Sequence, residues 1–535
     1  MRSLWLAAAA VVLAAPALAQ SVDRAAINKL IDEGTNHSQV MVTAEYLTDV
    51  IGPRLTNSPN MRKAEAWTQA KFREWGLINV HKEGFEFGRG WWIERSSVRM
   101  VAPRPVQLTA IPIAWTPATN GALTAPVIVA PMSKERDFEK WRGQLKGKVV
   151  LISRPGTASE PSRPPFQRYT GEELSKLDQF DWPNHDPEGA DRRLKRLDFA
   201  KKLDAFLKAE GAVAWAQMSR LDAKLLHGEG YLFTKEESPS LPGVEIAAED
   251  YRRLARLAKA GMNPTIEIDS QVRYDDSDSK AYNIIAEIPG SDPKAGYVMA
   301  GAHLDSWVAG DGAADNGAGS AMIMEAARLI AASGIKPKRT IRFALWAGEE
   351  QGILGSLAYI EQHIATRGSG NEPKQTGLSR FYGWNNRWPI NPKPGYDELA
   401  AYFNLDNGSG KVRGIYAENN PAVVPIFRDW LSPFSGMGAS AVVIDRTGGT
   451  DHYFMQAIGL PGFQFIQDPL DYNSRIHHTG ADTFDHLKGD DMRQGSIIIA
   501  SFLVNAANAE KALPKPPLPT KPAPTDPYAY SNDDD

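Results

Sequence analysis

Five separate segments of this sequence place histidine or acidic residues beside short hydrophobic runs. In chain order they carry His303 with Asp305, Asp315, the pair Glu349 and Glu350, Asp406, and the pair His477 and His478 followed by Asp482. Two imidazoles and several carboxylates are typical ligands of Zn²⁺, Co²⁺ or Mn²⁺, rather than of Ca²⁺ or Cu⁺. Four or five such ligands around one central carboxylate suit a pair of metal ions about 3.5–4 Å apart.

The adjacent glutamates are expected to differ in role. Side chains at neighbouring positions diverge, so one of Glu349 and Glu350 can bind a metal while the other faces a water molecule as general base. Their spacing does not say which is which. Asp305 and Asp482 lie close to His303 and His478 in the chain, and we expect their carboxylates to orient these imidazoles.

The elements that position these residues alternate between strands and helices. Strands are predicted at 284–288, 297–300, 340–346, 399–405 and 462–466, and helices at 317–332 and 354–363. This alternation predicts an α/β fold with a mixed, mostly parallel sheet sandwiched by helices. Each candidate residue lies at or beyond the carboxyl end of a strand, the edge where open α/β sheets bind ligands.

Composition excludes several other classes of protein. The chain has 535 residues, a net charge of −4 and no cysteine. Its length predicts two or more domains, and its charge argues against nucleic acid or an anionic membrane as the main partner. Disulfides, thiol catalysis and thiolate metal sites are ruled out. The motifs of serine hydrolases (G-x-S-x-G), single-zinc helix proteases (H-E-x-x-H) and P-loop enzymes are absent.

The two ends and the middle of the chain indicate its organisation. Residues 1–19 read as a secretory signal peptide, with a basic start, a short apolar run and an A-x-A site, so no membrane span should remain after cleavage. We expect an exported protein, periplasmic in a Gram-negative bacterium or secreted. Residues 121–270 are predicted to form an inserted domain without chemistry of its own. The catalytic part would comprise 20–120 and 271–512, with a disordered tail at 513–535.

A long segment rich in Gly, Pro and Asn separates His363 from Leu399 and contains Tyr382, Trp384 and Trp388. It is predicted to be a loop. A loop of this length is either functional or a surface insertion.

Together these motifs resemble the co-catalytic zinc exopeptidases, the family of bacterial leucyl-type aminopeptidases and plasma glutamate carboxypeptidase (carboxypeptidase Q). The matching stretches are IGPRLTNSPNMRKAEAW (51–67), GAHLDSWVAGDGAADNGAGSA (301–321), RTIRFALWAGEEQGILGS (339–356), FNLDNGSG (403–410), GGTDHYF (448–454) and HHTGADT (477–483). The segments KGKVVLISRPG (146–156), AEGAVAWAQ (209–217) and LPGVEIAAEDYRRL (241–254) resemble a protease-associated domain. That resemblance implies that the insert gates or positions the substrate.

The resemblance also implies residue roles. Two zinc ions per chain would be held by His303 and Asp406 at one position and by Glu350 and His478 at the other, with Asp315 between them. Glu349 would be the general base, with Asp305 and Asp482 supporting. His477 is a rival to His478 as ligand, and Asp451 in GGTDHYF is a further candidate near the site.

The implied activity is hydrolysis of a peptide bond at a chain terminus by a metal-bridging hydroxide. An aminopeptidase is favoured, because a free α-amine can meet a zinc ion and nearby carboxylates. His452 or Tyr453 would stabilise the oxyanion. The alternative is a dipeptidase or carboxypeptidase like carboxypeptidase Q, in which Arg446 or Arg475 would bind the substrate carboxylate. A glutaminyl cyclase or a non-catalytic binding protein fits the complete ligand set less well. The oligomeric state is not indicated.

Overall fold

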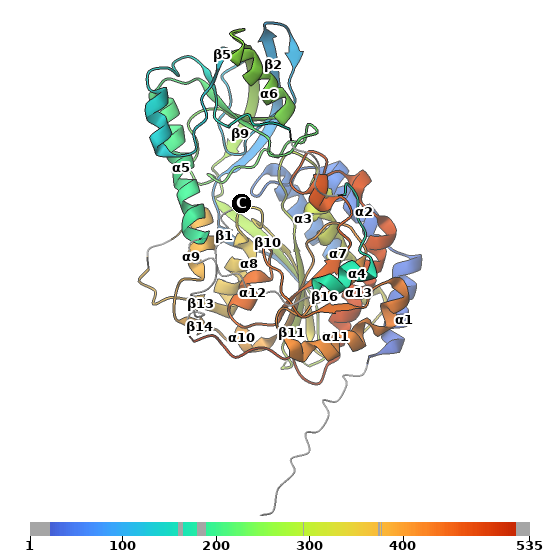
Figure 1. Cartoon of the computed structure of the whole chain (residues 1–535). Coiled ribbons are helices and arrows are strands. Elements are labelled where there is room, and N and C mark those ends of the chain that lie inside the picture. The colour runs from blue at the N-terminus through green and yellow to red at the C-terminus, as the bar shows by residue number, and fades with distance from the viewer. Residues whose placement is uncertain are drawn as a thin grey trace, which may run out of the picture.

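The computed structural model describes residues 22–158, 164–178, 189–292, 294–372, 375 and 377–520. The predicted signal peptide and the end of the predicted tail, from residue 521, lie outside these ranges. Among the described residues, no helix is both long enough and apolar enough to span a bilayer. Figure 1 shows a large lobe, built on a sheet flanked by helices, and a smaller lobe above it.

The large lobe is organised by one mixed sheet, which confirms the predicted fold class. Within the described residues its strand order is β1 (Ile78–Glu86), β10 (Lys280–Ile288), β12 (Thr340–Trp346), β11 (Tyr297–His303), β15 (Leu399–Asn404), β18 (Gly462–Gln467), β16 (Val412–Tyr416) and β17 (Ala441–Val443). The four central strands β12, β11, β15 and β18 are parallel, and β1 and β10 are antiparallel additions at one side.

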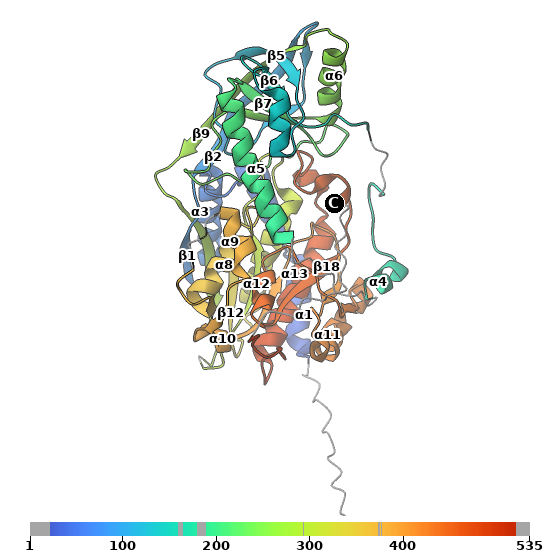
Figure 2. The same ribbon diagram turned by 60° about the vertical axis from the view of Figure 1, so that its left-hand side comes forward.

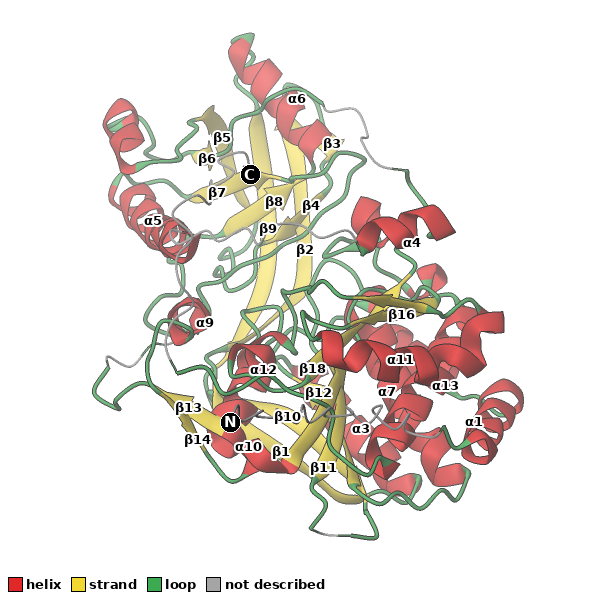
Figure 3. Cartoon of the chain, turned by 60° about the horizontal axis from the view of Figure 1, so that its bottom comes forward, coloured by secondary structure: helices red, strands yellow, loops and turns green. Residues whose placement is uncertain are grey.

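Helices cover both faces of this sheet, as Figures 1 and 3 show. Successive residues of β11 enter different cores: Val298 and Ala300 pack in one, and Met299 packs in the other. The first core is closed by α1 (Arg24–Asn36), α2 (Val40–Glu45), α3 (Pro59–Glu74), α7 (Ala318–Ala332), α11 (Val424–Leu431) and α13 (Gly489–Asn508). The second is closed by α8 (Leu354–Tyr359), α10 (Gly395–Glu398) and α12 (Tyr453–Ala457). Burial on both faces explains the continuous apolar runs of the central strands.

The smaller lobe has its own sheet and its own cores. Its order in the described chain is β3 (Val106–Gln107), β2 (Gly90–Ala102), β9 (Thr265–Asp275), β5 (Leu123–Val129), β6 (Val149–Leu151), β7 (Ala214–Met218), β8 (Gly243–Ile246) and β4 (Ala110–Pro112). Helices α5 (Gly189–Ala209) and α6 (Ala248–Lys259) pack beside it. Because β2, β3 and β4 pair within this sheet, the chain enters the lobe near residue 90, upstream of the predicted boundary at 121.

A two-stranded ribbon joins the two lobes. In the large lobe β1 pairs with β10, and Glu86 lies opposite Lys280. In the small lobe β2 pairs with β9, and Gly90 lies opposite Asp275. The chain therefore leaves and re-enters the large lobe on adjacent strands.

Two further connections tie the lobes together. Helix α5 descends from the small lobe towards α9 (Gly377–Trp384) of the large one, as Figure 2 shows. The segment containing α4 (Gly171–Leu177) lies against the large lobe, where Gln167 exchanges backbone hydrogen bonds with Leu470 and Arg168 forms an ion pair with Asp468 at 3.0 Å.

The region between His363 and Leu399, predicted to be a loop, contains regular structure. It includes a two-stranded antiparallel sheet of β13 (Ala365–Arg367) and β14 (Ile390–Pro392) as well as α9 and α10. Trp384 is buried in the second core, which is why this segment is ordered despite its Gly, Pro and Asn content.

Candidate metal centre

The candidate residues meet at one edge of the large sheet. Because β12, β11, β15 and β18 are parallel neighbours, their carboxyl ends share that edge. His303 is the last residue of β11, while the Glu349–Glu350 pair and Asp406 follow β12 and β15. His477 and His478 come after β18, beyond a short helical turn at Tyr472–Ile476. The structure therefore brings the five predicted segments together.

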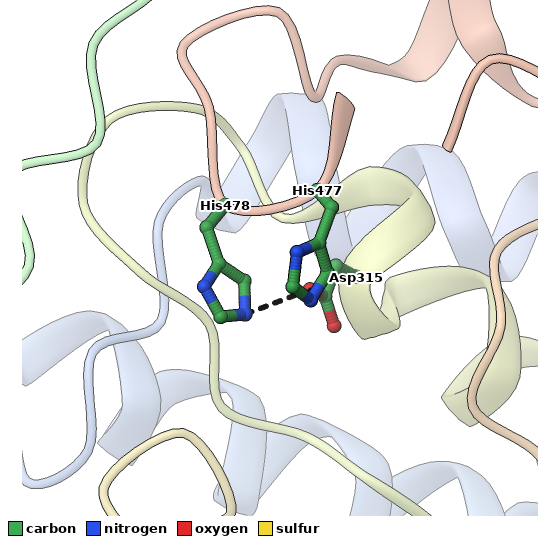
Figure 4. A group of neighbouring side chains, drawn as sticks. All are labelled: Asp315, His477 and His478. Carbon is green, nitrogen blue, oxygen red and sulfur yellow. Dashed lines mark ion pairs between the residues drawn. The ribbon is translucent and has the colours of Figure 1, made fainter. Parts of the chain in front are cut away.

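Asp315 lies between two groups of ligand-type side chains. Its Oδ1 is 3.2 Å from Nε2 of His303, and its Oδ2 is 3.3 Å from Nε2 of His478. Asp406 Oδ1 completes the first group, 3.4 Å from Nε2 of His303. Figure 4 shows the second group, in which the rings of His477 and His478 stack on each other and the ring of His478 forms an ion pair with the Asp315 carboxylate. One carboxylate thus belongs to two clusters that could each hold a metal ion.

The two glutamates take different places, as their spacing predicts. Glu350 Oε2 is 3.0 Å from Nε2 of His478, a member of the second cluster. Glu349 Oε2 is 3.9 Å from Nε2 of His303 and stands off from both clusters. Burial raises the pKa of Glu350 to about 7, with His478 opposing this. Burial also raises the pKa of Glu349 well above its usual value, and the negative charge of Asp406 adds to the effect.

Several polar atoms at this edge lack a hydrogen-bond partner in the described part of the chain. They are Nε2 of His303, Oδ2 of Asp315, Oε1 of Glu350 and Oδ1 of Asp406. Their near neighbours are other ligand-type atoms of the site, and buried atoms without a hydrogen bond are costly unless an ion satisfies them. Imidazole nitrogens and carboxylate oxygens match the preferences of zinc, so the donor set fits this metal.

Asp305 and Asp482 both support the site, but in different ways. His303 Nδ1 lies 3.0 Å from the backbone carbonyl of Asp305. The Asp305 carboxylate accepts hydrogen bonds from the backbone N–H groups of Glu349 and Glu350, each at 3.3 Å. Asp482 accepts from the N–H groups of Ala314 at 2.6 Å and Asp315 at 3.0 Å, and so holds the backbone that carries Asp315 rather than an imidazole.

The imidazole of His478 is held instead by a residue of the small lobe. Glu229 Oε1 lies 2.9 Å from Nδ1 of His478. Burial opposes ionisation of Glu229, but its hydrogen bond to His478 and the nearby charges of His478 and Arg220 lower its pKa to about 2. The sequence indicated no chemistry in this lobe. The only local signal is the run His227-Gly228-Glu229-Gly230, which has glycines on both sides of the acid.

A cavity of about 1120 Å³ opens beside these residues, between the two lobes. At its metal end it is lined by Asp315, Glu349, Glu350, Asp406 and His478. Side chains of the small lobe also line it, among them Arg154, Arg193, Arg196 and Arg220, of which Arg220 pairs with Glu229 beside His478. Tyr382 and Phe381 of α9 contribute to the wall, so the segment predicted as a long loop takes part in shaping the cavity.

Comparison with known proteins agrees with this geometry. The family model described as Peptidase family M28 matches residues 283–503, which include every proposed metal ligand. Carboxypeptidase Q from Xenopus laevis is 30% identical over 439 residues, covering 81% of this chain and 78% of that protein. The chain belongs to peptidase family M28. It is a zinc-dependent exopeptidase.

Solved structures show the same fold as this M28 chain. The peptidase M28 precursor from Shewanella amazonensis SB2B has a TM-score of 0.65 at 24% identity, covering 92% of this chain and 98% of that one. A zinc aminopeptidase from Bacillus subtilis has a TM-score of 0.56 at 18% identity, covering 89% and 97%. Because these matches span both lobes, they extend the likeness beyond the region matched by the family model.

Some residues proposed for the substrate pocket lie elsewhere in the M28 chain. His452 Nε2 is 3.2 Å from the Thr447 carbonyl, and the Tyr453 hydroxyl accepts a hydrogen bond from Asn385. Arg446 is exposed and Arg475 pairs with Asp471 at 2.9 Å. None of these four residues is among the described residues that line the cavity. Asp451 is buried and accepts a hydrogen bond from Ser356 at 2.6 Å.

Proposed function

We propose that this M28 peptidase is an exported di-zinc aminopeptidase that acts on short peptides. The observation that carries the proposal is the concentration of carboxylates at the metal end of the cavity, where Asp315, Glu349, Glu350 and Asp406 converge. With zinc bound, the charges of these carboxylates would be balanced by the metal ions, and the free α-amine of an unblocked peptide could meet a zinc ion and the nearby carboxylates.

Two zinc positions are proposed around Asp315. His303 and Asp406 would hold one ion, Glu350 and His478 the other, and Asp315 would be shared. His478 is preferred to His477 because its Nε2 lies closer to Asp315, 3.3 Å against 3.7 Å, and its side chain is 17% exposed against 44%. When bound, zinc would polarise the scissile carbonyl and lower the pKa of a water molecule.

Glu349 is proposed as the general base. It lines the cavity, stands outside both ligand clusters, and has its backbone fixed by Asp305. Its carboxylate would take a proton from the attacking water and give it to the leaving nitrogen. Asp305 and Asp482 would keep the glutamates and Asp315 in place.

A carboxypeptidase Q-like activity is the second candidate. The arginines that the small lobe contributes to the cavity wall favour it, because Arg154, Arg193 and Arg196 bring positive charge to the cavity that a substrate carboxylate would enter. Carboxypeptidase Q from Xenopus laevis also matches over both lobes. In this arrangement the carboxylate would point to the small lobe and the scissile bond to the metal end.

The test combines metal content with turnover of blocked peptides. The mature protein would be assayed for zinc per chain and given dipeptides and tripeptides that are unblocked, N-acetylated or C-amidated. The aminopeptidase is supported if the protein holds about two zinc ions and if N-acetylation abolishes cleavage while C-amidation leaves it unchanged. Loss only on C-amidation supports the carboxypeptidase, and loss with either block indicates a dipeptidase. Export is tested by sequencing the amino terminus of the secreted protein, which should begin after Ala19.

A further inference from the structure

A loop of the small lobe, Leu226–Tyr231, reaches the metal edge of the large lobe. It lies between β7 and β8 and carries Glu229, whose Oε1 is 2.9 Å from Nδ1 of His478. The two residues are 249 positions apart in the chain. The contact therefore exists only while the small lobe is docked on the large one.

The Glu229 carboxylate is itself fixed by its own lobe. Arg220 donates to Oε1 at 2.8 Å, and the Tyr231 hydroxyl donates to Oε2 at 3.4 Å. The Glu229 side chain is 14% exposed. A carboxylate held from both sides offers His478 a fixed acceptor, rather than a flexible surface partner.

The backbone around His478 depends on the same loop. His478 has a φ of +61°, in the left-handed region, which a residue with a side chain adopts only when its surroundings hold it there. The N–H of Gly480 donates to the carbonyl of Leu226 at 2.9 Å. Trp307 contacts both sides of the junction, with ring centroids 5.4 Å from Tyr231 and 6.1 Å from His478.

Two glycines, Gly228 and Gly230, allow the backbone conformation of the loop that carries Glu229. A Cβ on Gly230 would lie 2.2 Å from the backbone oxygen of Ala114, and Gly228 has a φ of +68°. Larger residues at these positions would disturb the backbone of the loop that carries Glu229.

We infer that Glu229 is a positioning residue for the zinc centre, supplied to His478 by the inserted lobe. An imidazole that donates its Nδ1–H to a carboxylate keeps the lone pair of Nε2 pointed at the metal, here towards Asp315 and Glu350. Zinc binding at this position thus depends on docking of the small lobe. The inference rests on the proposed function, because it takes His478 as a ligand.

The experiment compares Glu229→Ala and Glu229→Gln with the unchanged protein and with Glu236→Gln. Glu236 is exposed in the same lobe, so this control makes the same charge change away from the site. Zinc affinity is measured by competition with a chelator, and the Co²⁺-substituted proteins are compared by visible absorption. Thermal unfolding of the metal-free proteins checks that each variant is folded.

We expect Glu229→Ala to weaken one of the two zinc positions by about 10- to 100-fold and to alter the Co²⁺ spectrum. Glu229→Gln, whose amide oxygen still accepts from Nδ1–H, should lie between Glu229→Ala and the unchanged protein. Zinc affinities within about twofold in both variants overturn the inference. It is also overturned if zinc binding is unchanged and only KM for peptides with a free amine rises, since Glu229 would then contact substrate.

His478→Ala separates this inference from the proposed ligand set. Loss of one zinc in His478→Ala, with unchanged affinity in both Glu229 variants, overturns only the role of Glu229. Two zinc ions bound at unchanged affinity in His478→Ala overturn the ligand set, and the inference falls with it.

Discussion

Asp482 holds Asp315 by its backbone: one carboxylate spans the N–H groups of residues 314 and 315 and so fixes the carboxylate that lies between the two ligand clusters. Replacing Asp482 with Asn puts an amide nitrogen against one of these N–H groups. We expect weaker zinc binding at both positions, by about 10-fold, with the fold retained. Chelator competition measures this, and Asp485→Asn, at an exposed position, is the control. Unchanged affinity in Asp482→Asn contradicts the supporting role.

Glu349→Gln should separate metal binding from catalysis. The amide cannot take up a proton, whereas the ligand clusters do not need Glu349, so zinc content should stay the same while kcat falls by about 10²- to 10⁴-fold. Zinc per chain and turnover of an unblocked dipeptide are measured on one preparation. Turnover close to that of the unchanged enzyme excludes Glu349 as the base.

Asp315→Asn and Asp406→Asn should differ in how many of the two zinc positions they weaken. Asp315 pairs with both His303 and His478, whereas the ion pair of Asp406 within the described residues is with His303. We therefore expect Asp315→Asn to weaken both zinc positions and Asp406→Asn to weaken one. Titration of the metal-free proteins with Zn²⁺ distinguishes these outcomes. The same single loss in both variants is evidence against a shared carboxylate.

Arg54 stabilises the loop that leads to Asp315. Its buried guanidinium donates to the backbone carbonyls of Leu304 at 2.7 Å, Asp311 at 2.8 Å and Gly312 at 2.7 Å. Lysine cannot reach all of these acceptors, and each buried carbonyl left unpaired costs about 1–3 kcal/mol. Arg54→Lys should lower the unfolding free energy by about 3 kcal/mol in urea titrations. Arg104→Lys, at an exposed position, should have little effect.

Glu65 should make stability depend on pH. Burial raises its pKa from 4.5 to about 7, although Arg62 opposes this from 3.1 Å. Between these values the folded state binds more protons than the unfolded state, so the stability of the unchanged protein falls as pH rises. We expect its unfolding free energy to drop, relative to Glu65→Gln, by about 3 kcal/mol from pH 4.5 to pH 8. If the difference in unfolding free energy between the unchanged protein and Glu65→Gln does not vary with pH, the raised pKa of Glu65 is contradicted.

The grouping of the metal-ligand residues at one edge of the large sheet can be predicted from the sequence. Neighbouring parallel strands share their carboxyl edge, so residues that follow these strands come close together. The order of β12, β11, β15 and β18 and the positions of Asp315 and Asp406 are consistent with that rule. Glu229 could not be found in this way. Its contact with His478 depends on how the two lobes dock, and neither the hydrophobic periodicity nor the motif spacing of the sequence predicts that docking.

Other departures have local causes. Asp482 lies four residues from His478, which suggested a contact with the ring. The left-handed backbone of His478 turns the chain so that Asp482 faces the N–H groups before α7 instead. The segment from 364 to 398 has the composition of a loop, yet Trp384 and Ile390 are buried in the core beneath it and anchor helix α9 and strand β14.

The ribbon of paired strands between the lobes has a consequence for the history of the gene. Because Glu86 lies opposite Lys280, a short turn between them would close the large sheet, and the whole small lobe could be gained or lost in one insertion or deletion. In topology the small lobe is a removable module. In chemistry, on our inference, it is not, because an ancestor without it would have needed another acceptor for Nδ1 of His478, as the Asp305 carbonyl serves His303.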